Sequence, residues 1–245
     1  MKKIFGRPKS LTSEKTIYCP GCGHGIAHRL VAEVVDELKI REKTIGIAPV
    51  GCAVLAYDYW NFDVTEAAHG RPPAVATGIK RVHPGKVVFT YQGDGDLAAI
   101  GTAEIIHSAN RGENITVIFI NNAVYGMTKG QMAPTTILGQ KTTTTRAGRN
   151  SQLDGYPIKV CELLSSLEGV VYLERVALDS VPHILKAKQA IKKAFRNQLE
   201  QKGFSLVEVL SACPTTWGLS PQESLTWIKE KMIPVFPLGV VKDKA

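Results

Sequence analysis

Two short polar segments of the sequence could together hold a metal ion and a phosphate. The first is the tetrapeptide Gly93–Asp96 (GDGD), which follows the apolar run Val87–Tyr91. Its glycines let the backbone pass close to a ligand, and the helix expected just beyond them favours a phosphate at its N-terminus. The carboxylate of Asp94 could coordinate a hard cation such as Mg²⁺.

The second polar segment begins with Asn121 and Asn122, directly after the apolar run Ile115–Ile120. Both segments would then lie at the carboxyl edge of one sheet, where open α/β folds bind their ligands. A Gly-Asp-Gly tripeptide alone is common in ordinary turns. A second strand that ends in Asn-Asn at this spacing makes the pattern far more specific.

Five cysteines form the other chemically capable set. Cys19 and Cys22 have the spacing of metal ligands, but such a pair fits zinc, a redox dithiol or an iron–sulfur cluster. Cys52 and Cys213 each follow an expected strand and could converge with them into a cage of four thiolates, which suits a cubane cluster or structural zinc. Cys161 lies in an apolar helical pattern, which predicts a buried hydrophobic role.

The rest of the pattern predicts the elements that position these residues. Compact apolar runs typical of strands buried on both faces occupy Thr44–Ala48, Val87–Tyr91, Ile115–Ile120, Val170–Leu173 and Phe204–Leu210. Helical periodicity marks Val31–Leu38, Ala98–Asn110, Ile158–Leu167 and Pro182–Lys202. Strands that alternate with helices predict an α/β fold, with a parallel sheet covered by helices on both faces. We expect one domain over residues 1–213 and, over residues 214–245, an arm that packs on the domain or on a partner subunit.

Composition narrows the classes of function. The chain has 245 residues, a net charge of +8 and 44% hydrophobic residues, which is ordinary globular composition. No apolar run reaches the roughly 18 residues of a membrane span, and no signal-type stretch follows Lys2 and Lys3, so we expect a cytoplasmic protein that does not bind membranes. The basic cluster Lys186–Arg196 reads as the solvated face of an amphipathic helix, and without interleaved aromatic residues it does not favour nucleic-acid binding.

The GDG segment followed by NN resembles the thiamine-diphosphate-binding enzymes. Carried over position by position, this resemblance implies magnesium ligands at the side chains of Asp94 and Asn122 and at the carbonyl of Val124. It also implies that four further residues line the cofactor, namely Gly95, Asp96, Gly126 and Met127.

Several motifs in order resemble the β subunit of 2-oxoacid:ferredoxin oxidoreductases. They are CPGCG at 19–23, GC at 51–52, HGR at 69–71, VATGIK at 75–80, GDGD at 93–96, NNAVYGMT at 121–128 and GQ at 130–131. The resemblance implies that Cys19, Cys22, Cys52 and Cys213 hold one [4Fe-4S] cluster. It further implies contacts to thiamine diphosphate from His69 and from Val50, Gly51, Cys52 and Ala53.

The implied activity is oxidative decarboxylation of a 2-oxoacid with coenzyme A, which gives an acyl-CoA and CO₂ (EC 1.2.7 type). Electrons would pass from the cofactor through the cluster to ferredoxin. The family activates thiamine with a glutamate from a pyrimidine-binding domain, for which this chain has no room. The resemblance therefore implies a hetero-oligomer with a larger α subunit, or with α and γ subunits, and an active site at their interface.

Alternatives remain at this stage. The diphosphate-binding half of a non-redox decarboxylase would explain the GDG and NN segments but not the four cysteines. A zinc-stabilised nucleic-acid-binding module would leave the GDG segment unexplained. For the substrate, Lys129 stands where many family members carry glycine, and its charge could attract the second carboxylate of 2-oxoglutarate. We therefore favour 2-oxoglutarate, with a branched-chain acid such as 2-oxoisovalerate as a close alternative.

Overall fold

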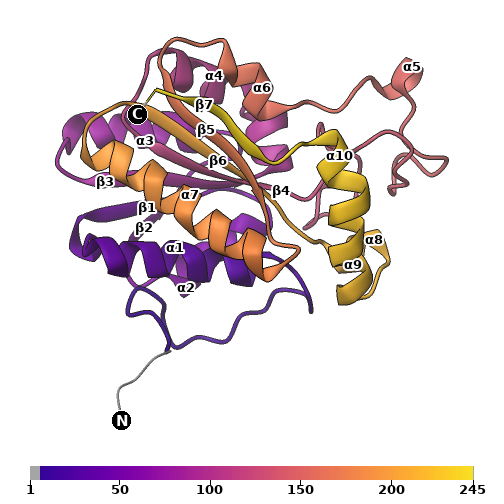
Figure 1. Cartoon of the computed structure of the whole chain (residues 1–245), viewed down its shortest axis with the longest axis horizontal. Coiled ribbons are helices and arrows are strands. Elements are labelled where there is room, and N and C mark those ends of the chain that lie inside the picture. The colour runs from indigo at the N-terminus through magenta and orange to yellow at the C-terminus, as the bar shows by residue number, and fades with distance from the viewer. Residues whose placement is uncertain (1–5, 245) are drawn as a thin grey trace.

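Seven strands form one sheet in the computed structural model, which describes residues 6–244 and so leaves Lys2 and Lys3 outside (Figure 1). Their order is β2-β1-β3-β4-β6-β5-β7, and every neighbouring pair is parallel except β5 and β7. The strands are β1 (Thr44–Ala48), β2 (Asp63–Glu66), β3 (Val87–Gly93), β4 (Thr116–Asn121), β5 (Val170–Ala177), β6 (Phe204–Leu210) and β7 (Gly239–Asp243). The predicted, mainly parallel α/β architecture is confirmed.

Helices cover both faces of this sheet. The helices are α1 (His24–Leu38), α2 (Ala56–Tyr59), α3 (Pro72–Val82), α4 (Thr102–Asn110), α5 (Ser151–Asp154), α6 (Val160–Ser165), α7 (Val181–Leu199), α8 (Pro214–Trp217), α9 (Pro221–Trp227) and α10 (Ile233–Val235). Short 3₁₀ turns occupy Arg41–Lys43 and Cys52–Leu55, and π-helical turns occupy Asp96–Ile100 and Ile228–Met232. Helices α1 and α7 pack in one hydrophobic core, and α3, α4 and α6 pack in the other.

The strands divide their side chains between these two cores because successive strand residues point to opposite faces. In β3, Val87, Phe89 and Tyr91 belong to the core under α1 and α7, whereas Val88 belongs to the opposite one. A strand that is buried on both sides reads as a continuous apolar run, which explains why its sequence was recognisable.

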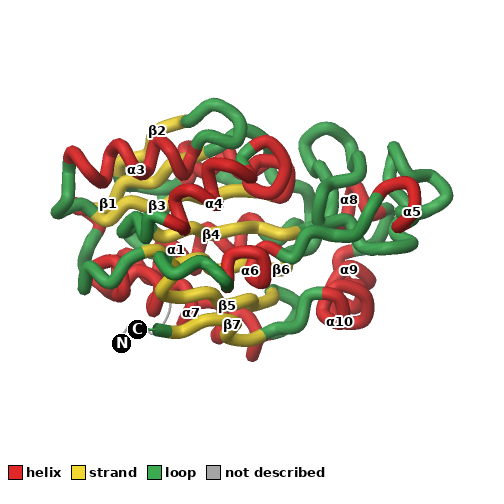
Figure 2. The backbone as a smooth tube through the Cα atoms, turned by 90° about the horizontal axis from the view of Figure 1, so that it is seen from above, coloured by secondary structure: helices red, strands yellow, loops and turns green. Residues whose placement is uncertain are grey.

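The segments that follow β4 and β6 gather beyond one end of the sheet (Figure 2). The long segment after β4 contains α5, and the chain after β6 forms α8, α9 and α10. A third, smaller core joins the two segments through residues such as Ile137 and Met232. Strand β7 then returns to pair with β5 at the edge of the sheet, and a domain boundary at residue 213 stays a prediction.

Helix α7 presents its basic residues partly to acidic side chains of the same chain. Lys188 forms ion pairs with Glu33 and Glu37 of α1, and Lys192 pairs with Glu37. The cluster that reads as a solvated face thus also joins the two helices. Within residues 6–244, we find no helix with the length and apolar character needed to cross a membrane.

Candidate active site

A cavity of about 270 Å³ lies where the carboxyl ends of the central strands meet the turn after β1. Its wall includes every residue for which the sequence predicted contact with the cofactor or magnesium: Val50, Gly51, Cys52, Ala53, His69, Asp94, Gly95, Asp96, Asn122, Val124, Gly126 and Met127. The fold therefore gathers segments that are far apart in the sequence. The roles of these residues stay predictions.

Asp94 lines this cavity and is only 2% exposed. Its carboxylate accepts hydrogen bonds from the backbone N–H of Asn122, at 3.2 Å, and of Ala123, at 2.8 Å. Burial raises the pKa of Asp94 to about 7, although these hydrogen bonds oppose the rise. The turn after β4 is thus wrapped around a buried carboxylate that a cation would help to keep ionised.

Thr135 is a contributor that the sequence analysis missed. Its hydroxyl donates to the carboxylate of Asp94 from the long segment after β4. No periodicity or motif connects two residues so far apart in the chain, so only the fold could show this contact.

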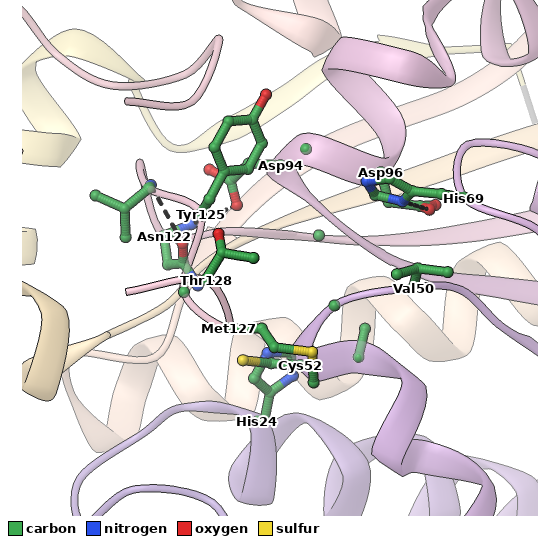
Figure 3. A pocket seen from close by; sticks show the side chains of 16 residues that line it. His24, Val50, Cys52, His69, Asp94, Asp96, Asn122, Tyr125, Met127 and Thr128 are labelled. Carbon is green, nitrogen blue, oxygen red and sulfur yellow. Dashed lines mark hydrogen bonds and ion pairs between the residues drawn. The ribbon is translucent and has the colours of Figure 1, made fainter. Parts of the chain in front are cut away.

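Asp96 and His69 form a hydrogen-bonded pair on the opposite side of the cavity from Tyr125 (Figure 3). Nδ1 of His69 lies 2.7 Å from a carboxylate oxygen of Asp96, which also accepts from the N–H of Gly70 at 2.8 Å. The second oxygen accepts from Nε2 of Gln92 at 2.6 Å. Asp96 therefore fixes the loop that carries His69, and the other ring nitrogen, Nε2, is left for a ligand.

The four predicted cluster ligands come together beside this cavity. A Cβ placed on Gly126 would lie 3.5 Å from Sγ of both Cys52 and Cys213, so the two sulfurs are no farther apart than twice that distance. Burial raises the pKa of Cys22 to about 12, and interactions with Cys213, Cys52 and Cys19 add to the rise. The thiols are thus close enough to disfavour one another's ionisation, a cost that bound metal would relieve.

The spacing of these sulfurs bears on the kind of metal they suit. Across residues 6–244, no three His, Cys, Asp or Glu side chains are close enough to enclose a single metal ion. Four thiolates around one zinc ion must each approach it to about 2.3 Å. Thiolates around a four-iron cluster stand farther apart because the cluster occupies the space between them. Four thiol side chains are a donor set that an iron–sulfur cluster accepts, and the choice between such a cluster and zinc stays a prediction.

Comparison with known proteins connects this site to a family. Residues 49–209 match the family model of the C-terminal TPP-binding domain of thiamine pyrophosphate enzymes. The 2-oxoglutarate synthase subunit KorB of Methanocaldococcus jannaschii is 37% identical over 223 residues, which are 89% of this chain and 78% of that protein. The chain belongs to the thiamine-diphosphate-binding subunits of the 2-oxoacid:ferredoxin oxidoreductases.

Two further similar proteins differ in how much of their own length this chain spans. The ketoisovalerate oxidoreductase subunit VorA of Methanothermobacter marburgensis is 48% identical over 245 residues, and this chain spans about half (51%) of its length. The 2-oxoglutarate:ferredoxin oxidoreductase of Magnetococcus marinus shares the fold, with a TM-score of 0.80 at 24% identity over 100% of this chain and 87% of that one.

In this oxidoreductase subunit, several aromatic and histidine rings lie beside the cavity. The sequence analysis did not assign them to the site. His24 lines the cavity, and its Nδ1 lies 2.7 Å from the hydroxyl of Tyr91. Burial lowers the pKa of His24 to about 4, so its ring is neutral. Tyr18, whose ring stacks on His24, donates from its hydroxyl to the carbonyl of Cys52 at 3.0 Å. This hydrogen bond stabilises the turn that contains Cys52.

Lys129 lies outside the wall of the cavity in this oxidoreductase subunit. Its backbone has a φ of +78° and the residue is exposed, whereas Met127 and Thr128 line the cavity. The structure therefore offers no support for contact between Lys129 and a substrate, and its part in substrate choice stays a prediction. Cys161, by contrast, is fully buried in the core under α6.

Proposed function

We propose that this subunit takes part in the oxidative decarboxylation of a 2-oxoacid with coenzyme A, and that its four-cysteine set holds the [4Fe-4S] cluster that receives the electrons. The observation that carries the proposal is that the cofactor cavity and the four-cysteine set share part of one wall. Cys52 both lines the cavity and faces Gly126 together with Cys213. An electron acceptor held there lies beside the donor, as two successive one-electron transfers to ferredoxin require.

The overall reaction determines which substrates and products the assembled enzyme must bind. A 2-oxoacid anion, coenzyme A and two oxidised ferredoxins give an acyl-CoA, CO₂, two reduced ferredoxins and one proton. Bound thiamine diphosphate supplies the carbanion that attacks the 2-oxo carbon. The protein supplies binding, orientation and exclusion of water.

The residues present fit the diphosphate end of that cofactor. Asp94, the side chain of Asn122 and the carbonyl of Val124 offer carboxylate, amide and carbonyl oxygens, which are the ligands that Mg²⁺ accepts alongside phosphates. His69, oriented by Asp96, would contact the diphosphate through Nε2. A Cβ on Gly95 would overlap the ring of Tyr125, so a larger residue there would require this ring to move.

A partner subunit is the second part of the proposal. Within the part of the chain that the structure describes, no glutamate lines the cavity, and the group that activates the aminopyrimidine would come from another subunit. Two apolar side chains on the wall, Val50 and Met127, are 46% and 48% exposed. A larger α subunit, or α and γ subunits, would cover them and complete the site, and ferredoxin would dock on the assembled enzyme.

For the substrate, we propose a branched-chain 2-oxoacid such as 2-oxoisovalerate ahead of 2-oxoglutarate. Among residues 6–244, no lysine or arginine lines the cavity, and Lys129 lies outside its wall. A second carboxylate in the cavity would therefore have no cationic partner among these described residues. The relative named for ketoisovalerate is also more similar (48%) than the one named for 2-oxoglutarate (37%). The test compares kcat/KM for both acids in the assembled enzyme, and a clear preference for 2-oxoglutarate would overturn the choice.

The decisive experiment is analysis of iron, sulfide and thiamine in the anaerobically purified complex, in wild type and in single Cys→Ser variants. Changes at Cys19, Cys22, Cys52 and Cys213 should each lose or damage the cluster. Cys161→Ser is the matched control and should keep the full iron content. Thiamine diphosphate without iron would instead indicate a non-redox decarboxylase, and zinc in place of iron would indicate a structural site.

A further inference from the structure

A hydroxyl group contacts one of the four clustered sulfurs. Oγ1 of Thr216 lies 2.8 Å from Sγ of Cys213, within the distance of a hydrogen bond to sulfur. The same oxygen lies 3.3 Å from the carbonyl oxygen of Cys213. A hydroxyl has one proton, so it donates to one of these acceptors at a time. The shorter contact is the one to sulfur.

The fold holds this hydroxyl in place from two sides. Thr216 belongs to the short helix α8, which is closed by a hydrogen bond from the N–H of Trp217 to the carbonyl of Cys213 at 3.1 Å. On its other side, a Cβ placed on Gly130 would lie 3.1 Å from Cβ of Thr216, so the segment after β4 packs tightly against it. The position of the hydroxyl is therefore determined by packing as well as by the hydrogen bond.

A donor at this place favours extra negative charge on the sulfur. The hydroxyl proton of Thr216 carries partial positive charge, and at a donor–acceptor distance of 2.8 Å it stabilises negative charge on the Cys213 sulfur. When an iron–sulfur cluster is reduced, part of the added charge is shared with its cysteine sulfurs. Hydrogen bonds to those sulfurs therefore stabilise the reduced form, and they are among the determinants of cluster potential.

We propose that Thr216 is a positioning residue that donates a hydrogen bond to the Cys213 sulfur in the cluster-loaded enzyme and thereby raises the reduction potential of the cluster. The inference rests on the proposed function, since it requires Cys213 to be a cluster ligand. It adds a determinant of the step in which electrons leave the decarboxylated substrate.

The test is a redox titration of the purified complex, with cluster reduction followed by visible absorption and electron paramagnetic resonance. Thr216→Val keeps the size of the side chain and removes the donor, so the midpoint potential should become more negative. Thr216→Ser keeps the donor and should stay close to wild type. Thr215→Val is the matched control, because Thr215 is the exposed neighbour in the same helix, and it should leave the potential unchanged.

An unchanged potential in Thr216→Val at full iron content would overturn the inference. An equal shift in Thr216→Ser would also overturn it, because packing rather than the hydroxyl would then be responsible. Should Thr216→Val fail to retain its cluster, Thr216→Ala takes its place with the same expected shift. Wild-type protein without iron and sulfide would refute the proposed function itself, which separates the two failures.

Discussion

The indole Nε1–H of Trp217 donates a hydrogen bond to the backbone carbonyl of Asn122, at 3.1 Å. Trp217 ends the helix that follows Cys213, whereas Asn122 begins the turn around Asp94. One side chain thus joins the segment of the proposed cluster to the segment of the proposed magnesium site. The two sites are mechanically connected through α8 as well as through the sheet.

Removing this connection should weaken cofactor binding without unfolding the protein. Trp217→Phe keeps an aromatic ring against Trp227 but loses the donor. A neutral hydrogen bond contributes about 0.5–1.5 kcal/mol, so affinity for thiamine diphosphate at fixed Mg²⁺ should fall roughly two- to tenfold by calorimetric titration. Trp227→Phe, which leaves the bond intact, serves as the control, and an equal loss there would assign the effect to ring packing.

The buried carboxylate of Asp94 makes a graded prediction possible. Asp94→Asn preserves shape but removes the charge, and Mg²⁺-dependent binding of thiamine diphosphate should disappear. Thr135→Val removes one donor to that carboxylate and should weaken binding roughly ten- to a hundredfold, in line with about 1.5–3 kcal/mol for a hydrogen bond to a charged group. Thr143→Val, a change at an exposed residue of the same long segment, should have no effect. Full affinity in Asp94→Asn would show that the ligand is elsewhere.

A buried ion pair between Arg175 and Glu208 should contribute strongly to the stability of the sheet where β5 pairs with β6. Both side chains are fully buried and their charged atoms lie 2.9 Å apart. Arg175→Met would leave Glu208 as an uncompensated buried charge and should lower the free energy of unfolding by about 3–5 kcal/mol. Lys202→Met removes a partner of the exposed Glu200 and should leave urea unfolding nearly unchanged. Comparable losses in both variants would contradict this distinction.

The acid stability of the protein should depend on His28. Burial and the neighbouring His24 hold the pKa of His28 well below its usual value. The unfolded chain then binds a proton that the folded chain excludes, so stability is full above about pH 6.5 and is lost as the pH falls below it. The rings that face His28 are those of Tyr18, His24, Tyr59, Trp60 and Tyr91.

His28→Phe should fit this aromatic environment and make the pH dependence shallower. Between pH 5 and 6.5, the loss of unfolding free energy should shrink by up to about 1.4 kcal/mol per pH unit, the value for one proton. The raised pKa of Asp94 changes stability in the opposite direction but equally in both proteins, so it cancels in the difference. Parallel pH profiles would show that His28 takes no part.

The elements recognisable from sequence are those in which burial dictates composition. The strands at Thr44–Ala48 and Phe204–Leu210 have the predicted bounds because both of their faces are covered. Strand β2 (Asp63–Glu66) was missed, since an edge strand with exposed ends resembles a polar loop. The contact of Thr135 with Asp94 depends on how two distant segments pack, and no local pattern encodes it. Thr216 is only three residues from Cys213, but its spacing does not reveal that its hydroxyl contacts the sulfur.

The order of the strands also determines which part of the molecule opens first. The strands that carry the site, β3, β4 and β6, have a hydrogen-bonded neighbour on each side, whereas β7 pairs only with β5. Amide hydrogens of β7 should therefore exchange quickly with solvent, through fraying of the edge strand. Those of β4 should exchange slowly, because they become accessible only when the whole sheet opens. The proposed magnesium ligands thus directly follow the slowest-exchanging strands, and loss of β7 need not release the metal.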